Sequence, residues 1–362
     1  MSTSGHTHTP AVLGRIPILL ITGFLGSGKT TLVNRLLADP AMSRTLVLVN
    51  EFGQVSIDTD LITRQGETMV ELSNGCVCCT LIDDLGTTLQ DFVDRRAKGQ
   101  LPAFDRVLIE TTGLANAGPI IRVLQEDERV RTNYAVDKVI TTVDGLLGMK
   151  NLDLHAEAVE QVALADRLVL TKVDRISDRS ALEPLRSRLC ALNAGAELLE
   201  AEQGKVDVGG LLGGRPVSDV RVADAPANTK HACDDPHCEH THDERGHHQA
   251  HESADRLEGP NATARHDAHI RSISLVSERA LSLADLDRFW KRLQESSSPN
   301  LLRVKGLIQV AETPDNPVVV QGVQQLYDEP VTLPAWPSED RRTRIVFIGW
   351  MLDRRQFESL LP

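Results

Sequence analysis

One segment near the amino terminus, GFLGSGKT at residues 23–30, constrains this chain more than any other. It fits the pattern G-x-x-x-x-G-K-[ST], in which glycines let successive backbone N–H groups surround an anion without interference from a Cβ atom. The apolar residues 16–21 before it predict a buried parallel strand, and residues 30–37 after it have the apolar spacing of a helix. A strand, a loop and a helix in this order place a helix N-terminus under the phosphates of a nucleotide.

The lysine and the hydroxyl of this loop have distinct expected roles. Lys29 supplies a positive charge to the β- and γ-phosphates, and Thr30 reaches Mg²⁺ through its hydroxyl. The predicted nucleotide-binding residues of the loop are Gly23, Gly26, Ser27, Gly28, Lys29, Thr30 and Thr31.

A motif with an acidic residue follows this loop by about 80 residues. Residues 105–109 predict another buried strand, which ends in Glu110-Thr111-Thr112-Gly113. In nucleotide hydrolases an acidic residue at the end of such a strand acts on Mg²⁺ or on its water shell, and a following glycine lets the backbone approach the γ-phosphate. Glu110 is therefore a candidate catalytic residue together with Lys29, and Gly113 is a candidate nucleotide-binding residue.

The tetrapeptide Thr171-Lys172-Val173-Asp174 after the predicted strand 166–170 indicates which base is bound. The carboxylate of Asp174 can accept both N1–H and the N2 amino group of guanine, whereas adenine presents an acceptor at N1. Because buried mismatches of this kind discriminate strongly, GTP is favoured over ATP. Lys172 is expected to lie along the base and ribose, and Thr171 stands where many GTPases have asparagine.

Three thiols in four positions, Cys76, Cys78 and Cys79, follow an Asn-Gly pair that predicts a turn. A turn is needed for all three to converge, because in an extended segment Cys79 would point away from the other two. Thiolates suit Zn²⁺ or Cu(I), and three local ligands leave one coordination position open, which suits transfer of a metal better than storage. Burial as small apolar side chains and a redox switch are the alternative interpretations. The single Cys190, on an apolar face of a predicted helix, is expected to lie in the core.

Composition excludes several classes of protein. A net charge of −12 over 362 residues argues against a nucleic-acid partner, no apolar run approaches a membrane span, and the polar first residues lack a signal-peptide core. These features predict a cytoplasmic protein without a membrane or nucleic-acid partner. The predicted regions are a disordered leader (1–14), a nucleotide-binding domain (15–215), a histidine-rich disordered linker (216–268) and a C-terminal α+β domain (269–362).

The predicted linker is unusual in composition. Nine of the twelve histidines lie between residues 231 and 269, together with Cys233 and Cys238. Few large apolar residues accompany them, so this segment cannot bury a core. Its side chains would bind Zn²⁺, Ni²⁺ or Co²⁺ loosely in several arrangements, and a solvated linker without a metal function is the alternative.

Taken together, these motifs resemble those of the CobW-type metal-handling GTPases, a P-loop group that also contains the nickel-inserting urease and hydrogenase accessory GTPases. The histidine-rich linker and the terminal α+β domain strengthen the resemblance. One departure is Gln54, which stands where some relatives carry a glutamate, so the predicted metal site contains no residue of the 50–58 loop. The motifs that carry the resemblance are residues 23–31, 50–53, 75–79, 110–113 and 171–174.

The resemblance implies an α/β fold, with a mostly parallel P-loop NTPase sheet flanked by helices and a smaller C-terminal α+β domain. It implies hydrolysis of GTP to GDP and phosphate with Mg²⁺, coupled to delivery of a metal from Cys76, Cys78 and Cys79 to a client apo-metalloprotein. Zinc is the expected metal, with Co²⁺ or Ni²⁺ as alternatives, and the oligomeric state stays open, a homodimer included. Two other functions remain: a metal buffer or sensor whose conformation the nucleotide sets, and a cobalt-handling accessory protein of cobalamin synthesis.

Overall fold

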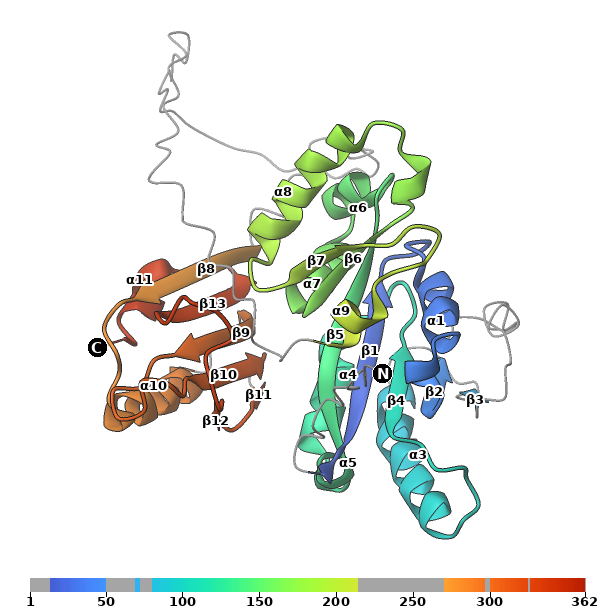
Figure 1. Ribbon diagram of the computed structural model, residues 1–362, viewed down its shortest axis with the longest axis horizontal. Coiled ribbons are helices and arrows are strands. Elements are labelled where there is room, and N and C mark those ends of the chain that lie inside the picture. The colour runs from blue at the N-terminus through green and yellow to red at the C-terminus, as the bar shows by residue number, and fades with distance from the viewer. Residues whose placement is uncertain are drawn as a thin grey trace, which may run out of the picture.

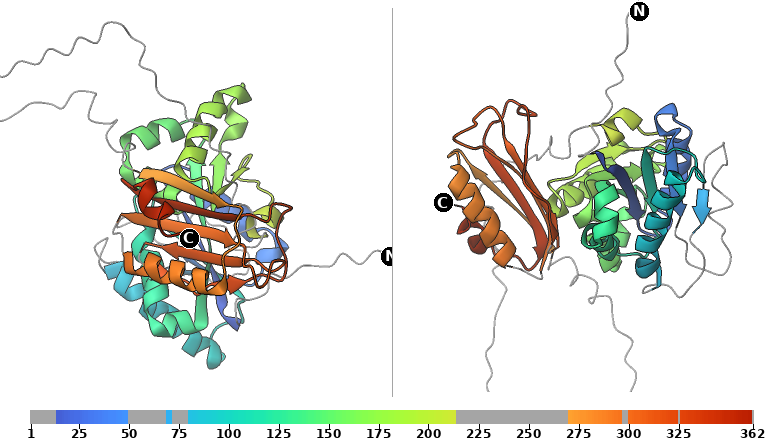
Figure 2. Two further views of the ribbon diagram at one scale, coloured as in Figure 1. Left: turned by 90° about the vertical axis from the view of Figure 1, so that its left-hand side faces the viewer. Right: turned by 90° about the horizontal axis from the view of Figure 1, so that it is seen from below.

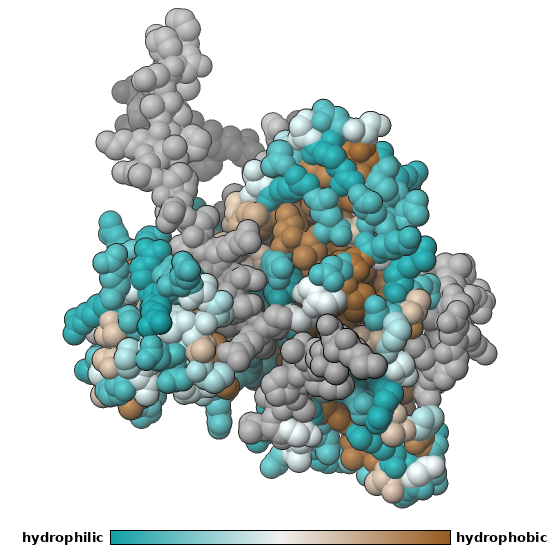
Figure 3. Space-filling model, viewed as in Figure 1, coloured by the Kyte–Doolittle hydropathy of each residue, from teal (hydrophilic) through white to brown (hydrophobic). Residues whose placement is uncertain are grey.

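The computed structural model describes residues 14–49, 69–71, 80–213, 270–296, 300–324 and 326–361 (Figure 1). These residues form two sheets, one in each half of the chain, and helices cover them. Hydrophilic residues cover most of the described surface that Figure 3 shows, and hydrophobic residues appear in patches near its centre. Within the described ranges, no helix combines the length and the apolar character needed to cross a membrane.

The first sheet has seven strands in the order β3-β2-β4-β1-β5-β6-β7, and every pairing in it is parallel. Because all strands run the same way, the residues that follow them gather at one edge of the sheet, where open α/β sheets bind ligands. The strands are β1 (Ile16–Gly23), β2 (Thr45–Val49), β3 (Met69–Glu71), β4 (Arg106–Glu110), β5 (Tyr134–Asp144), β6 (Arg167–Thr171) and β7 (Glu197–Glu200).

Helices bury both faces of this sheet. Ile18 and Leu20 of β1 lie in a core that includes side chains of α3, α4 and α7, whereas Leu19 and Ile21 lie in a second core with α1 and α9. Burial on both faces explains why β1 is a continuous apolar run rather than an alternating one. The helices are α1 (Lys29–Leu37), α3 (Thr80–Ala97), α4 (Ala117–Glu126), α5 (Glu128–Asn133), α6 (Gly148–Leu154), α7 (Ala156–Leu164), α8 (Glu183–Leu192) and α9 (Val208–Leu212).

The second sheet is antiparallel and has six strands in the order β11-β10-β9-β13-β8, with β12 paired to β10. Two helices cover one of its faces, and the other face turns toward the first sheet and its helices (Figure 2). Its elements are β8 (Ile270–Ser277), α10 (Leu283–Ser296), β9 (Leu301–Ile308), β10 (Val318–Val323), β11 (Leu326–Tyr327), β12 (Val331–Thr332), β13 (Thr343–Trp350) and α11 (Arg354–Glu358).

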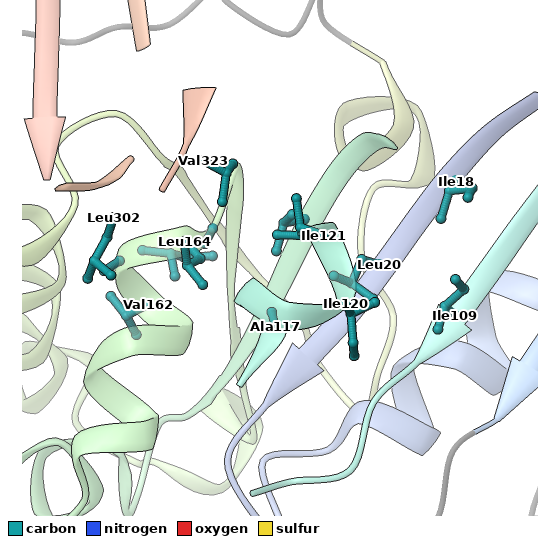
Figure 4. Close-up of a cluster of buried hydrophobic side chains, with 14 of the residues drawn as sticks. Ile18, Leu20, Ile109, Ala117, Ile120, Ile121, Val162, Leu164, Leu302 and Val323 are labelled. Carbon is teal, nitrogen blue, oxygen red and sulfur yellow. The ribbon is translucent and has the colours of Figure 1, made fainter. Parts of the chain in front are cut away.

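One apolar core joins the two halves of the chain. Leu302 and Val323 of the second sheet belong to the same buried cluster as Val162 and Leu164 of α7 (Figure 4). The antiparallel-sheet domain therefore packs directly on helices of the parallel-sheet domain.

The predicted fold class is confirmed: a parallel α/β sheet flanked by helices precedes a separate antiparallel-sheet domain. The prediction for Cys190 is wrong, because this side chain is exposed. Helix α8 turns Leu185, Leu189 and Leu192 inward, and Cys190 lies about 100° around the helix from Leu189. The helices between residues 117 and 164 were not predicted. One of them, α7, contacts the segment that follows Glu110.

Candidate functional site

The loop between β1 and α1 needs its glycines for both conformation and space. Gly23, Gly26 and Gly28 have φ values of 142°, 70° and 92°, in the region that side chains rarely adopt. A Cβ atom on Gly23 would lie 2.3 Å from Oγ1 of Thr142 and 2.8 Å from Oγ of Ser27. Helix α1 begins after Gly28, and no described side chain caps it, so its first N–H groups can bind an anion.

Lys29 lies within this loop. Its Nζ donates hydrogen bonds to the carbonyl oxygens of Gly23 (2.9 Å) and Phe24 (3.3 Å), and the residue is only 9% exposed. The positive charge is thus held inside the curve of the loop, where phosphate oxygens would be stronger acceptors than carbonyl groups.

Thr30, at the start of α1, meets Glu110, at the end of β4. Oγ1 of Thr30 donates to Oε1 of Glu110 at 2.9 Å, and Glu110 is buried at the end of β4, in register with Ile21 of β1. Hydroxyl and carboxylate oxygens are the hard donors that Mg²⁺ prefers, so these two residues fit that ion.

The segment that follows Glu110 lies against the phosphate loop. The Thr111 N–H donates to the Ile21 carbonyl, and the Thr111 hydroxyl donates to Oγ1 of Thr22, both at 2.9 Å. A Cβ atom on Gly113 would lie 2.7 Å from the Leu25 backbone nitrogen. Only a glycine allows this approach, which brings the backbone of Gly113 beside the loop.

The predicted base-binding motif lies at the same edge of the sheet. Thr171 donates from Oγ1 to the Ser27 carbonyl at 2.6 Å, which ties the end of β6 to the phosphate loop. Lys172 has a φ of 57°, and its Nζ donates to the buried Asp144 carboxylate at 2.6 Å. Asp174 is exposed, and its Oδ1 accepts the backbone N–H of Gln203 at 3.1 Å.

Two features near Asp174 escaped the sequence analysis. The Asp144 carboxylate holds Lys172 in place; Asp144 is the last residue of β5, and a carboxylate at the end of a strand is the sequence signal that could have indicated it. The turn after β7 reaches both Asp174 and α1: Arg35 Nε donates to the Gln203 carbonyl at 3.3 Å, and a Cβ on Gly204 would lie 2.8 Å from Thr31 Cγ2. A Gln-Gly pair after a short strand is a weak turn signal, so sequence alone did not place this turn beside the base site.

The predicted thiolate ligands Cys76, Cys78 and Cys79 lie outside the described residues, as do the 50–58 loop and the histidine-rich segment 231–269. In the part of the chain that the structure describes, no group of three or more His, Cys, Asp or Glu side chains is placed to hold a metal ion. The metal site therefore stays a prediction.

A phosphate loop between the first strand and helix of a parallel sheet, with the Thr30–Glu110 pair beside it, defines a P-loop NTPase. Residues 17–200 match the family model described as CobW/HypB/UreG, nucleotide-binding domain, and residues 270–362 match the cobalamin synthesis protein cobW C-terminal domain. The chain belongs to the CobW/HypB/UreG family.

Two zinc chaperones are similar to this protein over almost the whole chain. The zinc chaperone YjiA of Escherichia coli is 31% identical over 95% of this chain and 97% of its own length. The zinc chaperone CobW of Pseudomonas aeruginosa is also 31% identical, over 96% of this chain and 91% of its own. The crystal structure of Zn(II)-bound YjiA GTPase from E. coli superposes with a TM-score of 0.63 at 26% identity, covering 96% of this chain and 98% of that one.

Proposed function

We propose that this protein is a GTP-hydrolysing metallochaperone that binds a transition metal at Cys76, Cys78 and Cys79 and delivers it to client metalloproteins. Zinc is the expected metal, because the relatives that span the chain are named zinc chaperones. The observation that carries the GTPase part is structural: the Lys29 loop, the Thr30–Glu110 pair and Asp174 lie along one edge of the parallel sheet.

Each of these residues has a proposed role in the reaction. Lys29 and the backbone of residues 26–31 hold the phosphates, and Asp174 accepts hydrogen bonds from guanine. Mg²⁺, held by Thr30, would neutralise charge on the β- and γ-phosphates. Glu110 holds the Thr30 hydroxyl and orients the ion's water shell or the attacking water.

The position of the cysteines in the chain suggests how metal and nucleotide are coupled. They follow β3 and precede β4, which ends at Glu110, so one segment of the chain connects the proposed metal site to the γ-phosphate region. Coupling of this kind is reciprocal: metal changes GTP affinity by the factor by which GTP changes metal affinity.

Isothermal titration of Zn²⁺, Co²⁺ and Ni²⁺ tests this proposal, with GDP, with a non-hydrolysable GTP analogue and without nucleotide. The Cys76/Cys78/Cys79→Ser variant should lose the nucleotide-dependent site, and Cys190→Ser, at an exposed cysteine, should keep it. Lys29→Ala should abolish turnover, whereas Lys98→Ala, at an exposed lysine, should not. Equal zinc affinities in all three nucleotide states would refute the coupling.

A metal buffer or sensor is the second candidate, favoured by the nine histidines between residues 231 and 269. Binding of many metal equivalents without any GTP turnover would support it. Turnover lost in Lys29→Ala, together with transfer of metal to a client, would exclude it. The Co²⁺ titration bears on the cobalt-handling alternative. The cytoplasmic location and the four predicted regions of the chain are part of the same proposal.

A further inference from the structure

A glutamine that no sequence motif contains holds the backbone of the segment after Glu110. Gln161 lies on α7 and is 1% exposed. Its Nε2 donates to the carbonyl oxygens of Gly113 (3.3 Å) and Ala115 (3.0 Å). Its Oε1 is buried and has no hydrogen-bond partner among the described residues. The amide cannot be reversed, because Oε1 would then face two carbonyl oxygens.

These two bonds orient backbone groups next to the nucleotide site. In a trans peptide the C=O and N–H groups point in opposite directions. Drawing the Gly113 carbonyl toward α7 therefore directs the Leu114 N–H away from that helix, and the same holds for Ala115 and Asn116. Gly113 itself packs against the backbone of Leu25 in the phosphate loop. Gln161 thus sets the direction of N–H groups beside the place where the γ-phosphate would lie.

The residue before Gln161 anchors the same segment. Glu160 accepts a hydrogen bond from Nδ2 of Asn116 at 2.7 Å. Asn116 also caps α4, because its Oδ1 accepts the Gly118 N–H at 2.8 Å. Two successive residues of α7 therefore hold the chain from Gly113 to the start of α4.

The C-terminal end of α7 is bound to the C-terminal domain. The guanidinium of Arg303 on β9 donates to the Leu164 carbonyl at 3.0 Å and pairs with Asp166. Val162 and Leu164 lie beside Leu302 of the same strand in one buried cluster (Figure 4). Helix α7 therefore contacts the segment after Glu110 through Glu160 and Gln161 in its middle, and β9 through its last residues.

Helix α4 makes a second connection. Nη2 of Arg122 donates to Oε1 of Gln324 at 3.1 Å, and Nε2 of Gln125 donates to Oδ1 of Asp328 at 3.3 Å. Since α4 directly follows the segment held by α7, a shift of that segment would move contacts to the C-terminal domain on both helices.

We propose that Gln161 is a positioning residue that sets the backbone of Gly113–Ala115 for GTP hydrolysis, and that α7 and α4 transmit this setting to the C-terminal domain. The inference rests on the proposed GTPase function and adds the means by which the site is regulated. By linkage, whatever displaces the C-terminal domain changes the affinity for GTP, and GTP changes the packing of that domain.

Tryptophan fluorescence and steady-state kinetics test the proposal together. All three tryptophans lie in the C-terminal domain, and Trp336 and Trp350 pack against the cluster that spans both halves of the chain. Gln161→Met keeps the length of the side chain and removes the donors. We expect kcat to fall at least tenfold, with KM for GTP within threefold, because the hydrogen bonds of Gln161 go to the backbone carbonyls of Gly113 and Ala115. The fluorescence difference between the GDP and GTP-analogue states should fall below half of the wild-type difference.

Gln90→Met is the matched control, since Gln90 is also a helical glutamine with a buried, unpartnered Oε1, but on α3. It should change neither kcat nor the fluorescence difference. A merely structural role for Gln161 predicts a lower unfolding midpoint with unchanged kcat and fluorescence difference, and that result would overturn the inference. Absence of GTP turnover in the wild type would instead refute the proposed function.

Arg303→Met keeps the test decisive if Gln161→Met does not fold. Asp166 faces two positive groups, Arg303 and Lys305, so removal of Arg303 leaves a balanced pair and a folded protein is expected. The bond to Leu164 is lost, and the nucleotide-dependent fluorescence difference should fall below half. An unchanged difference in this variant would overturn the link between α7 and the C-terminal domain.

Discussion

Replacing Asp166 by asparagine should destabilise the protein more than any exposed charge change, because Asp166 compensates two buried cations. It pairs with Arg303 and, at 3.2 Å, with Lys305, and the three side chains are 9%, 7% and 6% exposed. The neutral amide would remove the carboxylate that pairs with both cations. Removal of one partner from a buried ion pair costs about 3–5 kcal/mol, a large part of the roughly 5–15 kcal/mol that holds a domain folded.

Urea unfolding at pH 7 measures this loss with two probes. Tryptophan fluorescence follows the C-terminal domain, which holds Trp290, Trp336 and Trp350, and far-UV circular dichroism follows both domains. The control is Asp315→Asn, whose partner Arg341 lies 2.8 Å away in a pair that is more than half exposed on both sides. That variant should lose less than about 1 kcal/mol. An Asp166→Asn loss no greater than this would refute the reasoning.

The same three charged groups predict how the free energy of unfolding depends on pH. Burial alone would raise the pKa of Asp166, but the charges of Arg303 and Lys305 and the Val139 N–H lower it from 3.8 to about 2. The folded-state pKa lies below the unfolded one, so this stabilisation is complete above pH 3.8 and is lost as the pH falls toward 2. The wild type should lose about 2 kcal/mol from this group over that range, and Asp166→Asn should not.

Three further predictions concern the nucleotide site. Gly23→Ala, which places a Cβ 2.3 Å from Thr142 Oγ1, should lower the free energy of unfolding more than Gly26→Ala, whose Cβ meets no described atom within 4 Å and which costs backbone strain of about 1–2 kcal/mol; equal losses in urea unfolding would contradict the geometry. Thr30→Ala should raise the Mg²⁺ concentration needed for half-maximal turnover about tenfold, and an unchanged Mg²⁺ titration would remove Thr30 from the ion site. Asp174→Asn should lower GTP affinity about a hundredfold and favour xanthosine triphosphate, whose O2 can accept from the amide; competition binding with both nucleotides decides this.

Much of the nucleotide site could be predicted from the sequence because its signals are local. The loop at 23–30 needs glycine at backbone conformations that few other residues adopt, and these needs are visible as letters in a short motif. Glu110 and Asp174 could be placed at one edge of the sheet because both follow apolar runs that read as parallel strands. Their assignment to catalysis and base recognition stays a prediction until the variants are measured.

Which residues of a helix face the core was less predictable than the presence of the helix. Cys190 was expected in the core, yet it is exposed, because a shift of one position on α8 turns a side chain by about 100°. The leucines of this helix outweigh one cysteine in deciding which side packs on the sheet.

The sequence alone determined the class of this protein: a P-loop, the apolar runs that precede its motifs, and the motifs of a metal-handling GTPase family are all patterns within short stretches of chain. Only the tertiary structure showed that Gln161 holds Gly113 from 48 positions away and that Asp166 pairs with Arg303 from 137 positions away. The physical reason is that backbone conformation and amphipathic periodicity are properties of neighbouring residues. The partner of a buried polar side chain is decided by which elements the folded core brings together.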